Sequence, residues 1–178
     1  MNRRVAITGF GVVSPVGNGQ EAFWQALAEG KSGIAPITRF DCGTFEVRLA
    51  GEVKTAVALP PEVREAALED PKIGFALAAV AEALAQAEID RLGRETLLHL
   101  GTSLEYFDLA KVASGPEPDF RRVAVRCLSG PARPLQVPLD TAGRAVARLW
   151  GDPGLSLTNC SACAASAQAI GHAFRAVR

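Results

Sequence analysis

The chain has 178 residues, of which 48% are hydrophobic and 21% charged, and its formal net charge is zero; this is the composition of one globular domain large enough to bury a core. No apolar run approaches the roughly 20 residues of a membrane span, and no apolar segment follows the two arginines near the start, so we expect neither a membrane protein nor a secretory signal. The four cysteines, at positions 42, 127, 160 and 163, do not form the pattern of a disulfide scaffold, and a reduced, cytoplasmic protein is expected.

The first thirty residues predict a strand followed by a helix. Residues 5–8 are short and apolar and end at a glycine, which predicts a buried strand. Asn18 and Glu21 have the spacing of a capping box, in which each side chain bonds a free backbone N–H at a helix start. The helix that follows, residues 20–29, ends at Gly30, a residue type suited to a C-terminal cap.

The next seventy residues predict two more strands and two helices. Alternation over residues 47–53 predicts a short strand, and Pro60-Pro61 opens a brief helix. A helix over residues 72–88 is predicted by one apolar stripe, formed by Ile73, Leu77, Val80, Leu84 and Ala87. Residues 96–101 predict a second buried strand.

The last forty residues predict a helix, a strand and a final helix. Asp140 is a plausible N-cap for a helix ending at Gly151, and residues 155–158 read as a strand. The final helix is expected to start near Cys163. Since strands alternate with helices, the sequence predicts a layered α/β arrangement with a parallel sheet.

Cys163 stands where an apolar strand turns into a helix through small residues. A helix start presents unpaired N–H groups and the positive end of the helix dipole, which favour the reactive thiolate. A lone cysteine is more often a buried structural residue, but the strand, the small-residue turn and the run Ile170-Gly171-His172 occur together here. We therefore expect a nucleophile. His172 lies about two and a half turns further along the helix and cannot reach the sulfur, and His99 is expected on an apolar strand.

The sequence resembles the elongating β-ketoacyl-acyl carrier protein synthases at both of its ends. The nucleophile segment of that family resembles Cys163 to Arg175, and its N-terminus resembles residues 4–19, with further matches in the segments Phe23-Trp24, Gly30 to Ile34 and Ile37 to Asp41. The resemblance implies a thiolase-like fold. It covers only the first part of such an enzyme, so residues 1–178 are expected to form its N-terminal half, without the C-terminal half.

The resemblance implies that Cys163 takes an acyl group from a carrier-protein thioester, which then condenses with a decarboxylated malonyl thioester in fatty-acid or type II polyketide biosynthesis. It implies no cofactor and no metal. The family's two catalytic histidines and its lysine have no counterpart here, so we expect the chain alone to be acylated at most. Ser103 and Leu104 resemble a segment lining the acyl pocket; the bulky Glu105-Tyr106-Phe107 either shortens that pocket or begins a helix.

The partners implied are an acyl carrier protein and either a second copy of this chain or a chain with the missing half. Residues 121–178 carry eight arginines against two aspartates, and a basic surface attracts an acidic carrier, although a solvated face explains the charge as well. Nucleic acid is not expected, because no aromatic residues interleave with these arginines. Residues 140–150 and 155–158 resemble the family's dimer interface.

Three alternatives remain open from the residues. A non-catalytic subunit would keep this half for dimerisation or carrier binding. Cys160 lies in a context with some likeness to the polyketide-type motif, although the downstream spacing fits Cys163. Cys160 and Cys163 also form a CxxC, which allows a thiol-disulfide redox protein but makes a poor zinc site, because no second such pair exists.

Overall fold

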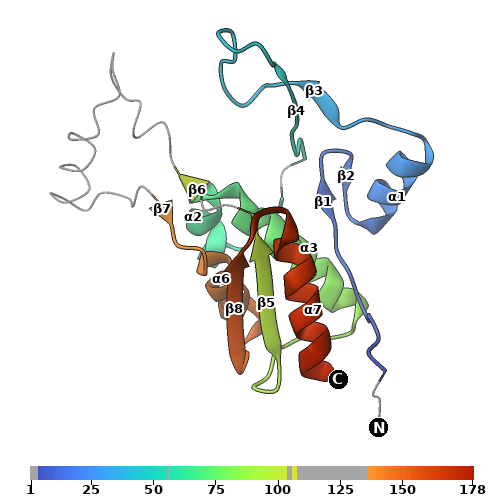
Figure 1. Ribbon diagram of the computed structural model, residues 1–178, viewed down its shortest axis with the longest axis vertical. Helices are drawn as coiled ribbons and strands as arrows, with labels where there is room; N and C mark the ends of the chain where they lie inside the picture. Colours follow the sequence, from blue (N-terminus) through green and yellow to red (C-terminus); the bar gives the residue numbers. More distant parts are fainter. Residues whose placement is uncertain (1–3, 56, 104–105, 108–135) are drawn as a thin grey trace, which may run out of the picture.

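The computed structural model describes residues 4–55, 57–103, 106–107 and 136–178. A pair of parallel strands, β5 (Leu97–Thr102) and β8 (Leu155–Cys160), forms its centre (Figure 1). The register sets Leu97 opposite Leu155 and Thr102 opposite Cys160. Because strand side chains alternate between faces, this register decides which residues face each covering layer. The sequence-based prediction of a parallel, layered α/β arrangement is confirmed.

Helices cover both faces of this strand pair. On one face α6 (Thr141–Trp150) packs closely, since a Cβ added at Gly143 would lie 3.0 Å from Ser156 Oγ and 3.7 Å from Leu100 Cδ1. Beyond α6 lie α2 (Pro61–Glu69) and α3 (Pro71–Gln86). The other face carries α7 (Ala165–Val177), coloured red in Figure 1 beside β5.

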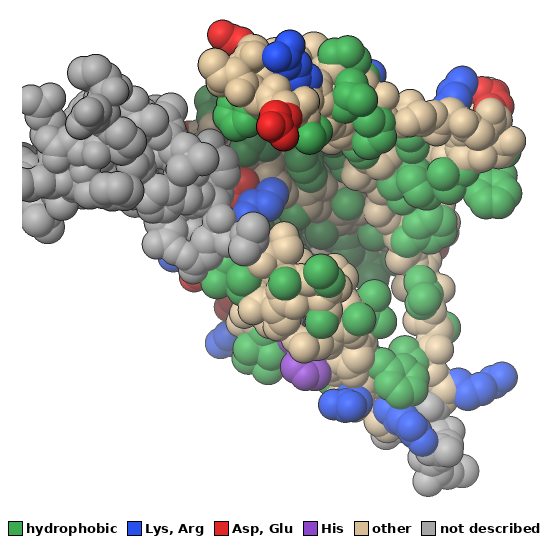
Figure 2. All heavy atoms as spheres, turned by 45° about the horizontal axis from the view of Figure 1, so that its top comes forward, with side chains coloured by type: hydrophobic (Ala, Val, Ile, Leu, Met, Phe, Trp, Pro, Cys, Tyr) green, Lys and Arg blue, Asp and Glu red, His purple; other side chains and the backbone are tan. Residues whose placement is uncertain are grey.

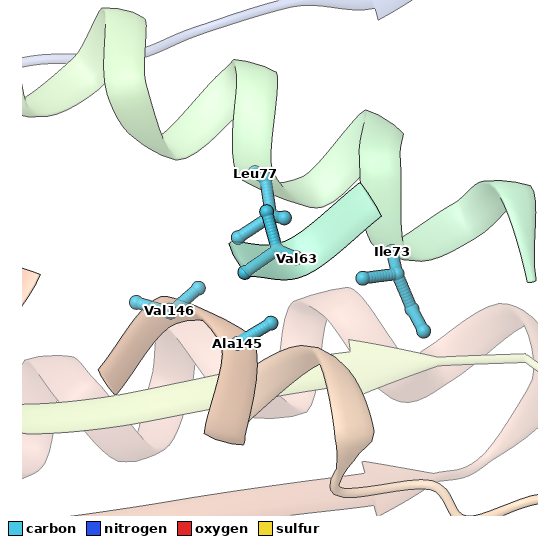
Figure 3. Packing of buried hydrophobic residues seen from close by; sticks show 5 residues of the cluster. All are labelled: Val63, Ile73, Leu77, Ala145 and Val146. Carbon is cyan, nitrogen blue, oxygen red and sulfur yellow. The ribbon is translucent and has the colours of Figure 1, made fainter. Parts of the chain in front are cut away.

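The hydrophobic core lies between these helices on the α6 face of the sheet. Five side chains converge there, as Figure 3 shows: Val63 of α2, Ile73 and Leu77 of α3, and Ala145 and Val146 of α6. Leu77 and Val146 are almost fully buried. Of the apolar stripe predicted along the third helix, Ile73 and Leu77 are in this core and Val80 packs against it.

Helix α3 begins where the sequence places two helix-start residues. The side chain of Asp70 accepts a hydrogen bond of 3.0 Å from the backbone N–H of Lys72, and Pro71 takes the first helical position. Both features satisfy or remove backbone donors that a helix start leaves free. The start of α3 is thus fixed locally, and the acidic residue Asp70 is buried there.

The segment 4–55, here called the N-terminal arm, contains only short elements. These are β1 (Val13–Ser14), β2 (Gly17–Asn18), α1 (Gln20–Ala28), β3 (Ile34–Pro36) and β4 (Leu49–Gly51). β1 pairs with β2, and β3 pairs with β4, both antiparallel. In Figure 1 the arm runs along one side of the molecule, over α3.

Polar contacts fasten the arm to α3. Glu82 accepts hydrogen bonds from the backbone N–H groups of Val12, at 2.9 Å, and Gln20, at 2.8 Å. Gln86, one turn further along α3, accepts from the N–H of Phe10 at 2.9 Å. The chain also passes α3 at short range, because a Cβ at Gly11 would overlap the backbone of Ala79.

Two predictions for the arm are wrong. Residues 5–8 form no strand, and the side chain of Ile7 is 86% exposed; a strand needs a neighbouring strand, and no described strand pairs with this segment. The capping box is also absent. The N-cap of α1 is Gly19, the side chain of Asn18 donates to Thr55 O instead, and Glu82 receives the free N–H of Gln20.

The remaining elements follow the predictions closely. The strand expected around residues 47–53 is β4, and its pairing with β3 was not anticipated. Gly30 has φ 66°, as its capping role requires. Asp140 is the N-cap of α6 but makes no side-chain cap bond, and it forms an ion pair with Arg144 at 3.4 Å instead. None of the helices in the described ranges is both long and apolar enough to cross a membrane.

The segment after β5 is a strand where it is described. β6 (Tyr106–Phe107) pairs with β7 (Gln136–Val137), so the alternative that Tyr106 and Phe107 begin a helix is not supported. Leu104 and Glu105 lie outside the described residues, as do Cys127 and the arginines at positions 121, 122, 126 and 133.

Candidate active site

A cavity of about 460 Å³ opens at the carboxyl ends of β5 and β8. Its wall is built from the ends of these strands and from the first turns of α3, α6 and α7. In parallel α/β arrangements, ligands bind beyond the carboxyl ends of the strands, where loops and helix starts meet. Figure 2 shows hydrophobic side chains gathered around a hollow on one face of the molecule.

Cys163 lines this cavity and is exposed to solvent. It lies in a single 3₁₀ turn, η1 (Ala162–Ala164), which leads directly into α7. The first hydrogen bond of the turn is donated by the N–H of Ala164 to Ser161 O, at 3.0 Å, so the N–H of Cys163 precedes it. The predicted setting, a thiol at a helix start, is present, with a 3₁₀ turn in place of the first α-helical turn.

The backbone beside the thiol has an uncommon conformation. Ala162 has φ 46°, a left-handed value that costs a non-glycine residue free energy and is found most often at turns and functional sites. This residue turns the chain from the direction of β8 into α7. The turn brings Cys163 to the cavity wall.

Asn159 ties the end of β8 to the start of α7. Its side-chain amide nitrogen lies 3.3 Å from Ser161 Oγ, 3.3 Å from Ala165 O and 3.1 Å from Gln168 Oε1. The amide oxygen is buried and has no hydrogen-bond partner. These contacts span the residues on both sides of Cys163, so Asn159 helps fix the turn that carries the thiol.

The wall of the cavity is mainly apolar, with one ion pair. Ile73 and Phe75 of α3, Leu100 of β5 and Leu139 before α6 contribute large apolar side chains. Asp70 and Lys72, which also line it, lie 3.4 Å apart between Oδ2 and Nζ. A mostly apolar wall with a few polar groups is typical of small-molecule binding sites.

Of the two predicted substrate contacts, one can be placed. Ser103 lines the same cavity as Cys163, so the structure brings these two predicted residues together. Leu104 lies outside the described residues. The carbonyl of Ser103 accepts a hydrogen bond of 3.2 Å from the thiol of Cys160.

The two histidines lie on the opposite face of β5 from the core. Their rings have centroids 5.0 Å apart and planes inclined by 32°, with His99 on β5 and His172 on α7. His99 Nδ1 is buried without a partner. Neither lines the cavity. As expected, His172 does not act beside the sulfur.

No group of three or more potential metal ligands occurs within the described ranges. Cys42, Cys160 and Cys163 are free thiols there. Sequence reasoning missed Asn159, Asp70 and Lys72 as parts of the site. Asn159 had a signal, since its side-chain amide stands at the end of a strand next to the nucleophile turn; the place of Asp70 and Lys72 in the wall follows only from the packing of α3.

The sequence matches a known family over residues 2–178, described as the N-terminal domain of β-ketoacyl synthases. The chain belongs to this family. Among curated relatives, the 3-oxoacyl-[acyl-carrier-protein] synthase 2 of Synechocystis sp. is 33% identical over 99% of this chain and 42% of its own length. The enzyme of the same name from Staphylococcus aureus strain COL is 31% identical, over 99% and 43%. That of Coxiella burnetii is 60% identical over 52 residues.

Solved structures show the same fold for this β-ketoacyl synthase domain. The ishigamide ketosynthase/chain length factor superposes with a TM-score of 0.73 at 26% identity, over 99% of this chain and 44% of that one. A ketosynthase domain of Streptomyces albus from the oxazolomycin system gives 0.70 at 19%, over 97% and 31%. The fold is therefore thiolase-like, as predicted. The chain spans less than half the length of the relatives it matches.

Proposed function

We propose that Cys163 is the acyl-accepting nucleophile of a β-ketoacyl-acyl carrier protein synthase and that residues 1–178 form the N-terminal half of that acyltransferase. One observation carries the proposal: Cys163, in the turn that leads into α7, lines a largely apolar cavity of about 460 Å³. The family match supports the reaction class, since its relatives are 3-oxoacyl-[acyl-carrier-protein] synthases.

The acyl-transfer step uses groups that this chain supplies. The Cys163 thiolate attacks the carbonyl carbon of a carrier-protein thioester, and a C–S bond forms while the carbonyl oxygen gains negative charge. The backbone N–H of Cys163, at the helix start, is a donor for that oxyanion. The carrier thiolate then leaves, takes up a proton, and leaves an acyl thioester on Cys163. The apolar wall receives the acyl chain.

Condensation needs more than the described cavity contains. Decarboxylation of a malonyl thioester produces an enolate, and its charge requires further donors beside the acyl-enzyme. The described residues of the cavity wall include no histidine. We therefore propose that this chain by itself stops at the acyl-enzyme and that fatty-acid or polyketide condensation requires groups from the C-terminal half.

The proposed partners are an acyl carrier protein and a second copy of the chain. One similar structure contains a type II polyketide acyl-carrier protein in complex with its ketosynthase. β8 pairs on one edge only within the described residues, and Leu155 and Leu157 on it are exposed. An unpaired, apolar strand of this kind favours isologous pairing with its copy. Such an enzyme would work in the cytoplasm.

Acyl transfer to the purified chain tests the proposal. An acyl carrier thioester is added to the wild-type chain and to the Cys163→Ala and Cys160→Ala variants, and the acyl adduct is located by mass spectrometry of the peptides. We expect an adduct on Cys163 in the wild type and in Cys160→Ala, and none in Cys163→Ala. An adduct that survives Cys163→Ala but is lost in Cys160→Ala assigns the nucleophile to Cys160 and refutes the proposal.

A non-catalytic synthase-like subunit is the second candidate. It is favoured by the incomplete set of catalytic groups in the described cavity. A cerulenin-like epoxide separates the two functions, because it alkylates a reactive thiol that is open to an acyl-binding cavity. Labelling of Cys163 supports the enzyme; a folded chain that forms dimers or binds carrier protein but stays unlabelled supports the subunit.

A further inference from the structure

The thiol of Cys160 lies over the end of β5. Cys160 is the last residue of β8 and pairs with Thr102 of β5. Its sulfur donates a hydrogen bond of 3.2 Å to the carbonyl of Ser103, the next residue along from β5. By strand alternation its side chain is on the same face as Thr158 and Thr102, both of which line the cavity.

Cys163 lies in the turn between β8 and α7. The start of α7 crosses closely over β5, since a Cβ at Gly101 would lie 2.5 Å from the carbonyl carbon of Ala165. Cys163 lines the cavity together with Ser103. The left-handed Ala162 bends the chain between the two cysteines. The carbonyl of Ser103 thus accepts from the Cys160 thiol, and Ser103 also shares a cavity wall with Cys163; both cysteines are exposed and unbridged.

We propose that Cys160 and Cys163 form a reversible disulfide in response to peroxide, and that this bond blocks the nucleophile. The inference rests on the proposed function for its consequence, because only a nucleophilic Cys163 is inhibited by being bridged. Formation of the bond itself depends only on the two thiols. Cys160 acts in this as a resolving thiol and takes no part in acyl transfer.

The oxidation proceeds in two balanced steps. The Cys163 thiolate attacks one oxygen of hydrogen peroxide, so an S–O bond forms, the O–O bond breaks, and hydroxide leaves and becomes water with one proton. The Cys160 thiolate then attacks the sulfenic sulfur of Cys163; the S–S bond forms, the S–O bond breaks, and the second oxygen leaves as water. Two thiols and one peroxide give one disulfide and two waters. A dithiol reductant reverses the change.

A disulfide with Cys160 would also protect Cys163 from irreversible oxidation. A sulfenic acid that finds no second thiol is oxidised further to the sulfinic acid, which ordinary thiols do not reduce. With Cys160 beside it, Cys163 is trapped as a disulfide that can be reduced. In cytoplasmic proteins disulfides are usually of this transient, redox-sensing kind.

The test uses a chain whose other two cysteines are replaced, Cys42→Ser with Cys127→Ser, and a matched variant that adds Cys160→Ser. Serine keeps a donor for the Ser103 carbonyl. Both proteins are reduced, treated with hydrogen peroxide, alkylated with iodoacetamide and digested with trypsin. The peptide of residues 149–175 contains both cysteines between two arginine cleavage sites, so an internal disulfide appears as loss of two hydrogens and of both alkyl groups.

We expect the internal disulfide in the first protein, with complete loss of Cys163 alkylation and full recovery after dithiothreitol. In the Cys160→Ser variant we expect sulfinic Cys163 and no recovery. Two free thiols after peroxide treatment, a disulfide between two chains, or equal recovery in both proteins overturns the inference. Acylation of the reduced proteins is measured in parallel: its absence refutes the proposed function, whereas the disulfide is scored by mass alone.

Discussion

The N-terminal arm and the body that carries the cavity, residues 61–103 and 136–178, differ in what holds them in place. The body has a core of five buried side chains drawn from three helices. The arm leaves most of its large apolar side chains exposed, namely Ile7, Phe10, Trp24, Leu27, Ile34, Phe40, Phe45, Val47 and Leu49. It is fastened instead by hydrogen bonds to Glu82 and Gln86.

The two regions are therefore stabilised by different interactions, apolar burial in the body and hydrogen bonds in the arm. Burial of apolar area is the larger stabilising contribution in a domain, and here it is concentrated beneath the cavity. Hydrogen bonds that are partly open to water contribute less. The body is therefore expected to hold the geometry around Cys163, while the arm is expected to open at lower free-energy cost.

Leu77→Ala should produce the largest effect on stability. Leu77 is 1% exposed, and removing a buried leucine costs about 2 to 5 kcal/mol through lost burial and the cavity that remains. Leu49→Ala in the arm, where the leucine is 56% exposed, is the matched control and should change the free energy of unfolding by no more than about 0.5 kcal/mol. Urea denaturation measures both. Equal losses would contradict the distinction between arm and body.

Gly101→Ala should disturb the body where the thiol is held. The new Cβ would lie 2.5 Å from Ala165, and overpacking of this kind costs about 1 to 3 kcal/mol. Because α7 must shift, alkylation of Cys163 by the epoxide should slow as well. The control is Gly171→Ala in α7, where the new Cβ would have nothing within 4 Å. This substitution should raise the free energy of unfolding by up to about 1 kcal/mol. A destabilised Gly171→Ala with an unaffected Gly101→Ala would reverse the assignment.

Glu82→Ala should release the arm and leave the body folded. The side chain of Glu82 accepts hydrogen bonds from the backbone N–H groups of Val12 and Gln20. A hydrogen bond to a charged group contributes about 1.5 to 3 kcal/mol to stability. Amide hydrogen exchange should show lost protection in residues 10–25 and unchanged protection in β5 and β8. Glu21→Ala, an exposed first-turn residue of α1, is the control. Loss of protection throughout the chain would show that arm and body unfold together.

The smallest effect concerns Glu52, the residue after β4. A hydrogen bond of 2.7 Å from the Thr38 hydroxyl is the main cause that lowers the pKa of Glu52 below its ordinary value. A lowered pKa in the folded chain means that this contact stabilises above the ordinary glutamate pKa and is lost as the pH falls through the lowered one. Thr38→Val should raise the pKa of Glu52, whereas Thr38→Ser should keep it low; an NMR titration of the carboxyl carbon measures both. An unchanged pKa in Thr38→Val would exclude this hydrogen bond as the cause.

Sequence patterns predicted the body well because each of its elements carries its own evidence. The apolar stripe along residues 72–88 is a local feature, and the structure confirms the helix that it predicts. The strand over residues 5–8 failed for the opposite reason, since a strand exists only through a partner. The capping box failed because Glu82, more than sixty residues away, supplies the acceptor.

For the site, the local residue pattern located the thiol at a helix start, and the resemblance to the synthase family predicted Ser103 near it. It did not identify Asn159 as the clamp of the turn, because the acceptors at Ala165 and Gln168 are reached only after α7 folds back along the sheet. The sequence also did not predict the apolar wall of the cavity, because that wall forms only where α3 and α6 pack over the ends of the strands.

The sequence alone determined the order of the main helices and strands of the body, the family, and the position of Cys163 at the turn into α7, since short-range spacing encodes each of these. Tertiary structure alone decided that Cys163, Ser103 and the first turns of α3 and α6 share one cavity, and that the thiol of Cys160 contacts the carbonyl of Ser103. The physical reason is that periodicity fixes which face of an element is apolar, whereas only the packing of those faces brings together residues that are far apart along the chain.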